Sequence, residues 1–107
     1  MNRGEVVTIA LPGAYGKPRP AVIVQSDLFS TLSSATILPI TSELRDTPLL
    51  RTTIEPSPVN GLRVTSQIMI DKAQTVPRGK IGARIGTLDS DTMMTVNRLM
   101  AIFLGIA

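Results

Sequence analysis

The chain has 107 residues, the length of one typical domain, so we expect a single domain over residues 1–107. Apolar residues make up 43% of the sequence, charged residues make up 18%, and the net charge is +3, so an anionic partner is permitted but not required. The sequence has no cysteine and no histidine, which excludes disulfides, thiolate nucleophiles, serine–histidine catalysis and the usual zinc ligands.

Short β-branched runs separated by proline, glycine and asparagine extend as far as residue 89. They predict strands near residues 5–11, 21–27, 36–42, 50–56, 63–76 and 80–89. The segment 12–20 has three prolines and two glycines and is expected to be a loop. Asn60 and Gly61 predict a turn, because both residue types tolerate positive φ. Since no helical period lies between the strands, the pattern favours a mainly β fold, a small antiparallel barrel, over a parallel α/β sheet.

The hydrophobic period changes near the C-terminus, where we expect an α-helix. Residues 89–91, Asp-Ser-Asp, form a polar cluster suited to a helix N-terminus. One apolar stripe follows at helical spacing: Met93, Val96, Met100 and Phe103. Further apolar residues widen this stripe, so we expect the helix to make contacts on two sides, to the core and to a second copy of the chain.

The sequence predicts no membrane-spanning segment. The most apolar stretch, residues 93–107, is interrupted by Thr95, Asn97 and Arg98 and is shorter than the roughly 18–20 apolar residues that a span needs. The first residues have the pattern of a strand and not of a signal peptide. We therefore expect a cytoplasmic protein without a membrane partner.

The groups left for catalysis are arginine, lysine, hydroxyls, carboxamides and carboxylates. Arg19 lies between two prolines directly before an apolar run, and Thr41 and Ser42 end a predicted strand. Such groups suffice for the attack of an RNA 2′-hydroxyl on the adjacent phosphate, because the substrate itself supplies the nucleophile. A guanidinium pairs with two phosphate oxygens, and a hydroxyl can hold the phosphate in place.

Several motifs occur in a fixed order over nearly the whole chain. They are residues 1–7 (MNRGEVV), residues 19–27 (RPAVIVQSD), residues 38–42 (LPITS), Gly61-Leu62 with Ser66, residues 70–76 (IDKAQTV) and residues 85–106. In this order they resemble the MazF/PemK family of toxin endoribonucleases of type II toxin–antitoxin systems.

That resemblance implies a specific fold and activity. The fold would be an SH3-like antiparallel barrel of the CcdB/MazF kind with a C-terminal helix, and the protein would be a homodimer. It would cleave single-stranded RNA, in particular mRNA, at selected sequences without a metal or cofactor, and a cognate antitoxin protein would neutralise it. The resemblance assigns catalysis to Arg19, which would stabilise charge or protonate at the phosphate, and to Thr41, which would position the phosphate.

Further residues are candidates for RNA binding. They are Tyr15, Lys17, Ser42, Ser66, Gln67, Asp71, Lys72 and Gln74. Tyr15 would stack on a base and Lys17 would supply charge. Asp71 also has a structural interpretation, as a strand cap or as the partner of a neighbouring lysine.

Three positions depart from the family pattern and leave alternatives open. Met69 stands where some members have arginine, Lys72 where glutamine is usual, and Gln74 where arginine is usual. One alternative is therefore a degenerate toxin that only binds its antitoxin. The other is a non-catalytic CcdB-like inhibitor of a protein target such as DNA gyrase, although the C-terminal FLGIA lacks the Trp-Gly-Ile ending of that group.

Overall fold

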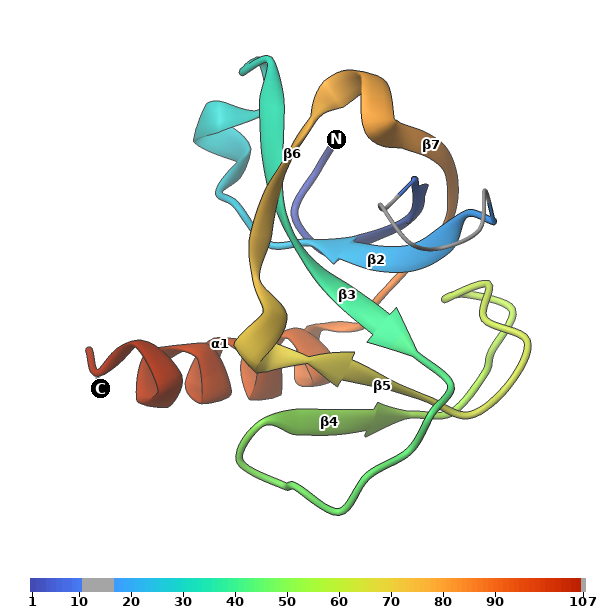
Figure 1. Ribbon diagram of the computed structural model, residues 1–107, viewed down its shortest axis with the longest axis vertical. Coiled ribbons are helices and arrows are strands. Elements are labelled where there is room, and N and C mark those ends of the chain that lie inside the picture. The colour runs from blue at the N-terminus through green and yellow to red at the C-terminus, as the bar shows by residue number, and fades with distance from the viewer. Residues whose placement is uncertain (11–16, 107) are drawn as a thin grey trace.

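The structure is a computed structural model that describes residues 1–10 and 17–106. Within them the chain forms β1 (Glu5–Ile9), β2 (Arg19–Ile23), β3 (Ser34–Thr41), β4 (Arg51–Ile54), β5 (Ser66–Met69), β6 (Gln74–Pro77), β7 (Ile81–Thr87) and α1 (Ser90–Leu104). Short 3-10 helices connect some of them: η1 (Asp27–Phe29), η2 (Ile70–Lys72) and η3 (Arg78–Lys80). This order confirms the predicted mainly β fold with a C-terminal helix (Figure 1).

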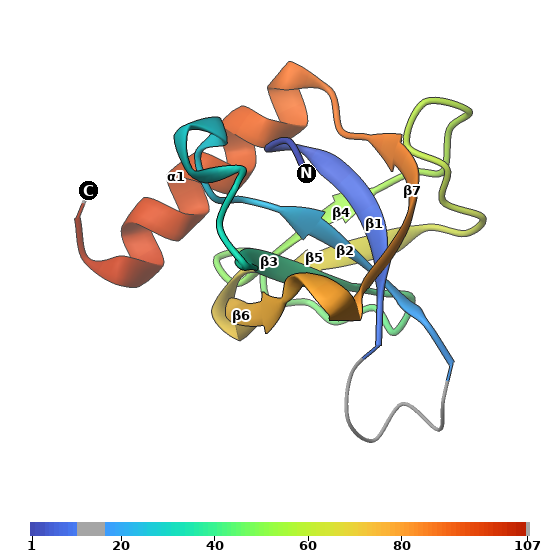
Figure 2. The ribbon, with the colours of Figure 1, turned by 90° about the horizontal axis from the view of Figure 1, so that it is seen from above.

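The strands pair antiparallel in the order β4-β5-β3-β2-β1-β7. The long strand β3 is shared, because its Ser34 end pairs with β6 and its Thr41 end pairs with β5. β6 pairs with β3 and β7 pairs with β1, so the two strands are opposite edges of the part ordered β6-β3-β2-β1-β7. In the chain, however, they follow each other directly through η3. The sheet therefore curls into an open barrel, as the two views show (Figures 1 and 2).

Two apolar clusters fill the two faces of the central strands. Val6 and Val22 are paired across β1 and β2 and lie in the cluster that α1 covers. Their chain neighbours Val7 and Ile23 point the other way, into the second cluster. Neighbouring residues of a strand face opposite sides, so the parts of a strand that are buried on both sides have consecutive apolar residues. This explains the consecutive buried residues Val6-Val7 in β1 and Ala21-Val22-Ile23 in β2.

Helix α1 confirms the predicted C-terminal helix and its N-terminal signal. The Asp89 side chain caps it by accepting a hydrogen bond from the Thr92 backbone N–H at 2.7 Å. Val96 and Leu99 are buried in the core, whereas Phe103, from the predicted stripe, is 48% exposed. The last turn of α1, which contains Phe103, extends beyond the sheet (Figure 2).

The predicted extended run over residues 63–76 is wrong in its middle. It breaks at η2, where Ile70 turns inward and is 1% exposed. The turn takes up a change of register: Ile40 pairs with Ile68, but Ile37 pairs with Gln74, three residues beyond the Asp71 that an unbroken ladder would reach. One straight strand could not make both ladders.

The second predicted strand is shifted relative to the structure. Strand β2 begins at Arg19 and ends at Ile23, whereas the predicted strand begins at residue 21 and ends at residue 27. The Ser26 side chain accepts a hydrogen bond from the Leu28 backbone N–H at 3.2 Å and so starts η1, which ends the extended backbone. The earlier start places Arg19 on a strand and not in the preceding loop.

Candidate active site

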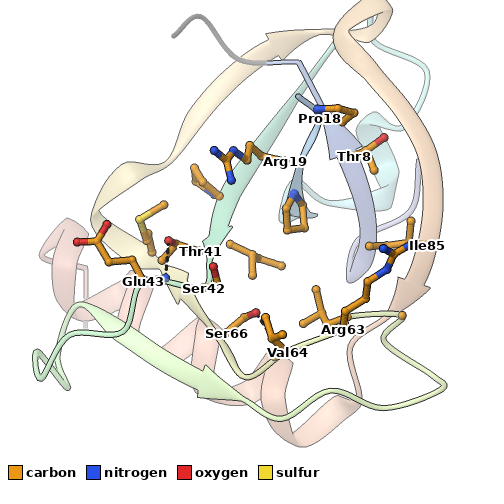
Figure 3. A pocket seen from close by; sticks show the side chains of 16 residues that line it. Thr8, Pro18, Arg19, Thr41, Ser42, Glu43, Arg63, Val64, Ser66 and Ile85 are labelled. Atoms are coloured by element: carbon orange, nitrogen blue, oxygen red, sulfur yellow. Dashed lines mark hydrogen bonds between the residues drawn. The ribbon is translucent and has the colours of Figure 1, made fainter. Parts of the chain in front are cut away.

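A pocket of about 920 Å³ opens on one side of the curled sheet (Figure 3). Its lining comes from five strands and from the loops that follow β3 and β4. The lining residues are Thr8, residues 18–20, residues 39–43, residues 61–64, Ser66, Met69 and Ile85. Two arginines and several hydroxyls therefore share the pocket with apolar side chains, a combination that suits a ligand with both charged and apolar parts.

Arg19, the first residue of β2, carries one of the two guanidinium groups. The β1–β2 ladder pairs Arg19 with Ile9 and Pro20 with Thr8. The rings of Pro18 and Pro20 fix their own φ angles and restrict the residues before them, so the backbone around Arg19 has few conformations. The Arg19 side chain is exposed and makes no hydrogen bond or ion pair with another residue that the structure describes. It is therefore available to an anionic ligand.

Thr41, the last residue of β3, supplies a hydroxyl. Its Oγ1 accepts a hydrogen bond from the Glu43 backbone N–H at 3.1 Å (Figure 3). A hydroxyl that accepts from its own backbone still has a hydrogen to donate, so Thr41 can donate to a phosphate oxygen. Ser42 follows it, is exposed and lines the same pocket.

The β2–β3 register brings Arg19 and Thr41 into this one pocket. Ala21 pairs with Pro39, and continuing the same register for two residues places Arg19 opposite Thr41. Opposite residues of an antiparallel pair point to the same face of the sheet. Both residues line the pocket, which therefore has a cation and a hydroxyl donor in its lining.

Of the other candidates on β5, Ser66 lines the pocket and Gln67 does not. Ser66 is buried and its hydroxyl donates to the Val64 carbonyl at 2.9 Å. The Gln67 side chain, 7% exposed, accepts from the Arg45 backbone N–H at 2.9 Å and from Arg51 Nη1 at 3.1 Å. It also donates to the Arg45 carbonyl and to Thr53 Oγ1. Gln67 thus fixes the segment that follows Thr41.

The remaining candidates that the structure describes are not among the pocket-lining residues. Asp71 and Lys72 are on η2, where Lys72 Nζ lies 3.7 Å from Asp71 Oδ2. Gln74 is exposed on β6 and pairs with Ile37. Lys17 is exposed directly before the pocket residue Pro18. Tyr15 lies outside the described residues.

Glu43 is a pocket residue that the sequence analysis missed. The Arg45 guanidinium donates to its carboxylate at 2.9 Å, and this hydrogen bond and charge hold the pKa of Glu43 below its ordinary value. Glu43 is therefore ionised and already paired near Thr41. It also adds the one carboxylate of the pocket lining.

Arg63 and Thr8 are also pocket residues that the sequence analysis missed. The motif Gly61-Leu62 directly precedes Arg63, so a search for charged residues beside family motifs would have found it. Met69, noted only as a departure from the family pattern, lines the pocket as well. An apolar thioether is thus part of the lining at this position.

Two other features bear on the class of protein. In the described ranges, 1–10 and 17–106, no three His, Cys, Asp or Glu side chains are grouped as metal ligands would be. Within those ranges no helix combines the length and apolar character that crossing a membrane requires.

A curled antiparallel sheet with a C-terminal helix and an arginine–threonine pocket is the arrangement that the sequence motifs led us to expect of a toxin. The family model of the PemK-like, MazF-like toxins of type II toxin–antitoxin systems matches residues 2–104. A probable endoribonuclease MazF of Mycolicibacterium smegmatis is 47% identical over 108 residues, which cover 100% of this chain and 99% of that one.

Solved structures resemble the fold as well. A mycobacterial endoribonuclease in complex with its cognate antitoxin has a TM-score of 0.84 at 21% identity, covering 100% of this chain and 97% of that one. The Mycobacterium tuberculosis toxin MazF-mt6 has a TM-score of 0.82 at 23% identity, covering 96% of this chain and 98% of that one. MazF in a MazE-MazF crystal from Deinococcus radiodurans has a TM-score of 0.80 at 18% identity, covering 100% and 98%.

This chain belongs to the PemK-like, MazF-like toxin family of type II toxin–antitoxin systems. The predicted family and the predicted CcdB/MazF-like fold are thereby confirmed. The prediction of an enzyme agrees with the endoribonuclease name of the 47% identical relative.

Proposed function

We propose that this protein is an endoribonuclease toxin that cleaves single-stranded mRNA at selected sequences without a metal. Two findings support the proposal: the 47% identity to a probable endoribonuclease MazF over the whole chain, and the shared pocket of Arg19 and Thr41. The second finding carries the chemistry, because it supplies a cation and a hydroxyl donor to one phosphodiester.

The proposed reaction is an internal transfer at phosphorus. The substrate's 2′-oxygen gives its proton to a solvent water and attacks the adjacent phosphorus, and the bond from phosphorus to the 5′-oxygen of the next nucleotide breaks. The leaving oxygen takes up a proton from solvent, so the products are a 2′,3′-cyclic phosphate and a 5′-hydroxyl. Negative charge builds up on the non-bridging oxygens during the attack, and stabilising this charge lowers the barrier.

Arg19 and Thr41 divide the work at that phosphate. The planar guanidinium of Arg19 stays charged and donates two parallel hydrogen bonds to the non-bridging oxygens. The Thr41 hydroxyl, oriented by the Glu43 backbone N–H at 3.1 Å, donates to the phosphate and holds it in line for attack. Ser42 and Ser66 stand beside them in the pocket as further hydroxyls.

We also propose the partners that the family resemblance implies. These are a cognate antitoxin and a second copy of the chain, acting in the cytoplasm. A related mycobacterial endoribonuclease was solved with its cognate antitoxin, which supports the first of these. The family match favours the nuclease over a CcdB-like gyrase inhibitor, whose target would be a protein and not RNA.

The test is cleavage of a mixed pool of unstructured RNAs in the presence of a chelator. We expect cuts at a short shared sequence, with a cyclic phosphate on the upstream product. The same RNA with a single 2′-deoxy nucleotide at the cut site should stay intact, because it lacks the nucleophile. An absence of cleavage by the folded protein would support the degenerate antitoxin-binding alternative instead.

A further inference from the structure

A second arginine, Arg63, lies across the pocket from Arg19 and Thr41. Figure 3 shows its side chain beside Ile85 of β7, whereas Arg19 and Thr41 lie on the opposite side of the opening. Like Arg19, Arg63 is exposed and has no hydrogen bond or ion pair to any other described residue. The pocket thus has one available cation on each side.

The loop that carries Arg63 is held by a buried side chain. Asn60 is 6% exposed, and its Oδ1 accepts from the backbone N–H groups of Ser57 and Leu62, each at 3.0 Å. Its Nδ2 donates to the Glu55 carbonyl at 2.9 Å. All the hydrogen-bonding groups of this side chain therefore hold the loop's own backbone in one shape, directly before Arg63.

Close backbone contacts fix the same loop against β7. The Thr87 backbone N–H donates to the Val59 carbonyl at 2.9 Å. Gly61 has φ +71°, and a Cβ there would lie 2.0 Å from the Ile85 carbonyl oxygen. A Cβ on Gly86 would meet the Asn60 backbone at 2.4 Å. The loop is thus preorganised, so Arg63 starts from a fixed point on the pocket wall.

The size and charge of the pocket indicate what Arg63 contacts. A volume of about 920 Å³ is near the upper end of the range for small-molecule sites, so the pocket has room for more than one phosphodiester. The carboxylate of the lining, Glu43, already binds Arg45 and does not pair with Arg63. Leu62 and Val64, on either side of Arg63, also line the pocket. Their apolar side chains cannot form hydrogen bonds with the edge of an RNA base.

We propose that Arg63 binds the phosphodiester next to the scissile one, so that the two arginines hold consecutive linkages of one RNA strand. This inference rests on the proposed endoribonuclease function. Arg63 is then a binding residue that contributes to substrate affinity and register, whereas Arg19 acts at the reacting phosphate. Because phosphate contacts carry no sequence information by themselves, Arg63 affects all sequences alike.

The test compares Arg63→Gln with Arg98→Gln, which removes the same charge from an exposed position on α1. Binding of a labelled RNA hexamer, made uncleavable by one 2′-deoxy nucleotide at its cut site, is measured over a range of salt concentrations. We expect Arg63→Gln to weaken binding about tenfold or more and to lower the slope of log affinity against log salt by about 0.7. Arg98→Gln should change neither quantity by a comparable amount, and Arg63→Lys should keep most of the slope.

A second comparison uses substrate length. On a cleavable hexamer, Arg63→Gln should raise KM and leave kcat within about twofold. On a cleavable dinucleotide, which has only the scissile phosphate, the variant and the unchanged protein should react alike. The phosphate assignment would be overturned if Arg63→Gln and Arg98→Gln had equal salt slopes. It would also be overturned if Arg63→Gln kept the salt slope of the unchanged protein but cut at a different sequence. In both cases RNA cleavage itself would persist. If the unchanged protein neither binds nor cuts RNA, the proposed function fails and this inference with it.

Discussion

Arg19 of β2 and Thr41 of β3 line one pocket, and the β2–β3 register that pairs Ala21 with Pro39, if continued for two residues, would set them opposite each other. Each stands at an end of its strand, where the side chain leaves the ladder and reaches the pocket. A one-residue slip between the two strands would turn one of them to the other face of the sheet. The apolar pairs Val22–Leu38 and Ile23–Ile37, which are completely buried, hold this register in place.

The Thr41 hydroxyl should contribute to the rate and not only to the turn. Thr41→Val keeps a similar shape but removes the hydrogen-bond donor, so we expect kcat to fall about 10²-fold. Thr41→Ser keeps both the donor and the acceptor for the Glu43 backbone N–H, and should stay within about tenfold of the unchanged protein. Single-turnover cleavage with saturating RNA measures both. Full activity in Thr41→Val would remove Thr41 from the mechanism.

Gln67 should matter for stability more than for direct RNA contact. Gln67→Ala leaves the Arg45 backbone N–H and carbonyl without their buried partner, so we expect the free energy of unfolding to fall by about 1–3 kcal/mol. Gln74→Ala is the matched control, since Gln74 is exposed on β6, and should change stability by less than about 0.5 kcal/mol. Urea unfolding compares the two. Equal stabilities would contradict the buried hydrogen-bond network.

Gly61 should be essential for the stability of the loop that carries Arg63. Gly61→Ala adds a Cβ 2.0 Å from the Ile85 carbonyl oxygen at φ +71°, so we expect at least about 2 kcal/mol of destabilisation. Gly79→Ala provides the control, because nothing lies within 4 Å of a Cβ added there. Thermal unfolding should separate the two variants clearly. A stable Gly61→Ala protein would mean that the loop is not held against β7.

The helix cap should make stability depend on pH in the acid range. Hydrogen bonds from the Thr92 side chain and backbone N–H hold the pKa of Asp89 below its ordinary value. Because the folded-state pKa is lowered, ionised Asp89 stabilises the fold at pH values above the unfolded pKa of about 3.9. This stabilisation is lost as the pH falls from there through the folded-state pKa. Asp89→Ala should therefore lower the melting temperature at neutral pH, with a smaller deficit near pH 3.

Asp89→Asn separates the cap from the charge. Asparagine is also a good N-cap, so this variant should keep most of the stability at neutral pH and lose less of it on acidification. Melting temperatures measured from pH 3 to pH 7 give the comparison. A deficit of Asp89→Ala that stays constant over this range would show that ionised Asp89 does not stabilise the helix.

The strands and the helix could be predicted because their signals are local. Short β-branched runs beside glycine, proline or polar segments located β1, β3 and β7, and the acidic cluster before Met93 located the start of α1. The break at η2 could not be predicted this way, because the residues that lead into it, Ile68, Met69 and Ile70, are apolar and typical of a strand. Its cause is non-local: β5 and β6 pair with β3 in two different registers.

The site was predictable where a motif marked it and not elsewhere. Arg19 and Thr41 belong to motifs, and the structure brings them into one pocket. Gln67 looked equivalent to Ser66 in sequence, but adjacent strand residues face opposite sides, and only the register with β3 and β4 decides which one lines the pocket. Arg63 could have been noted because it directly follows Gly61-Leu62, but its place in the pocket depends on the Asn60 contacts and on the approach to β7.

The most direct measurement is the single-turnover rate of RNA cleavage by Arg19→Ala and Arg19→Lys, at saturating substrate and with a chelator present. The account predicts a loss of about 10²- to 10³-fold for alanine, because the charge on the phosphate loses its paired donors, at an unchanged melting temperature. Lysine should recover only part of the rate, since a point charge cannot replace the planar fork. Cleavage by Arg19→Ala at the rate of the unchanged protein would contradict the account.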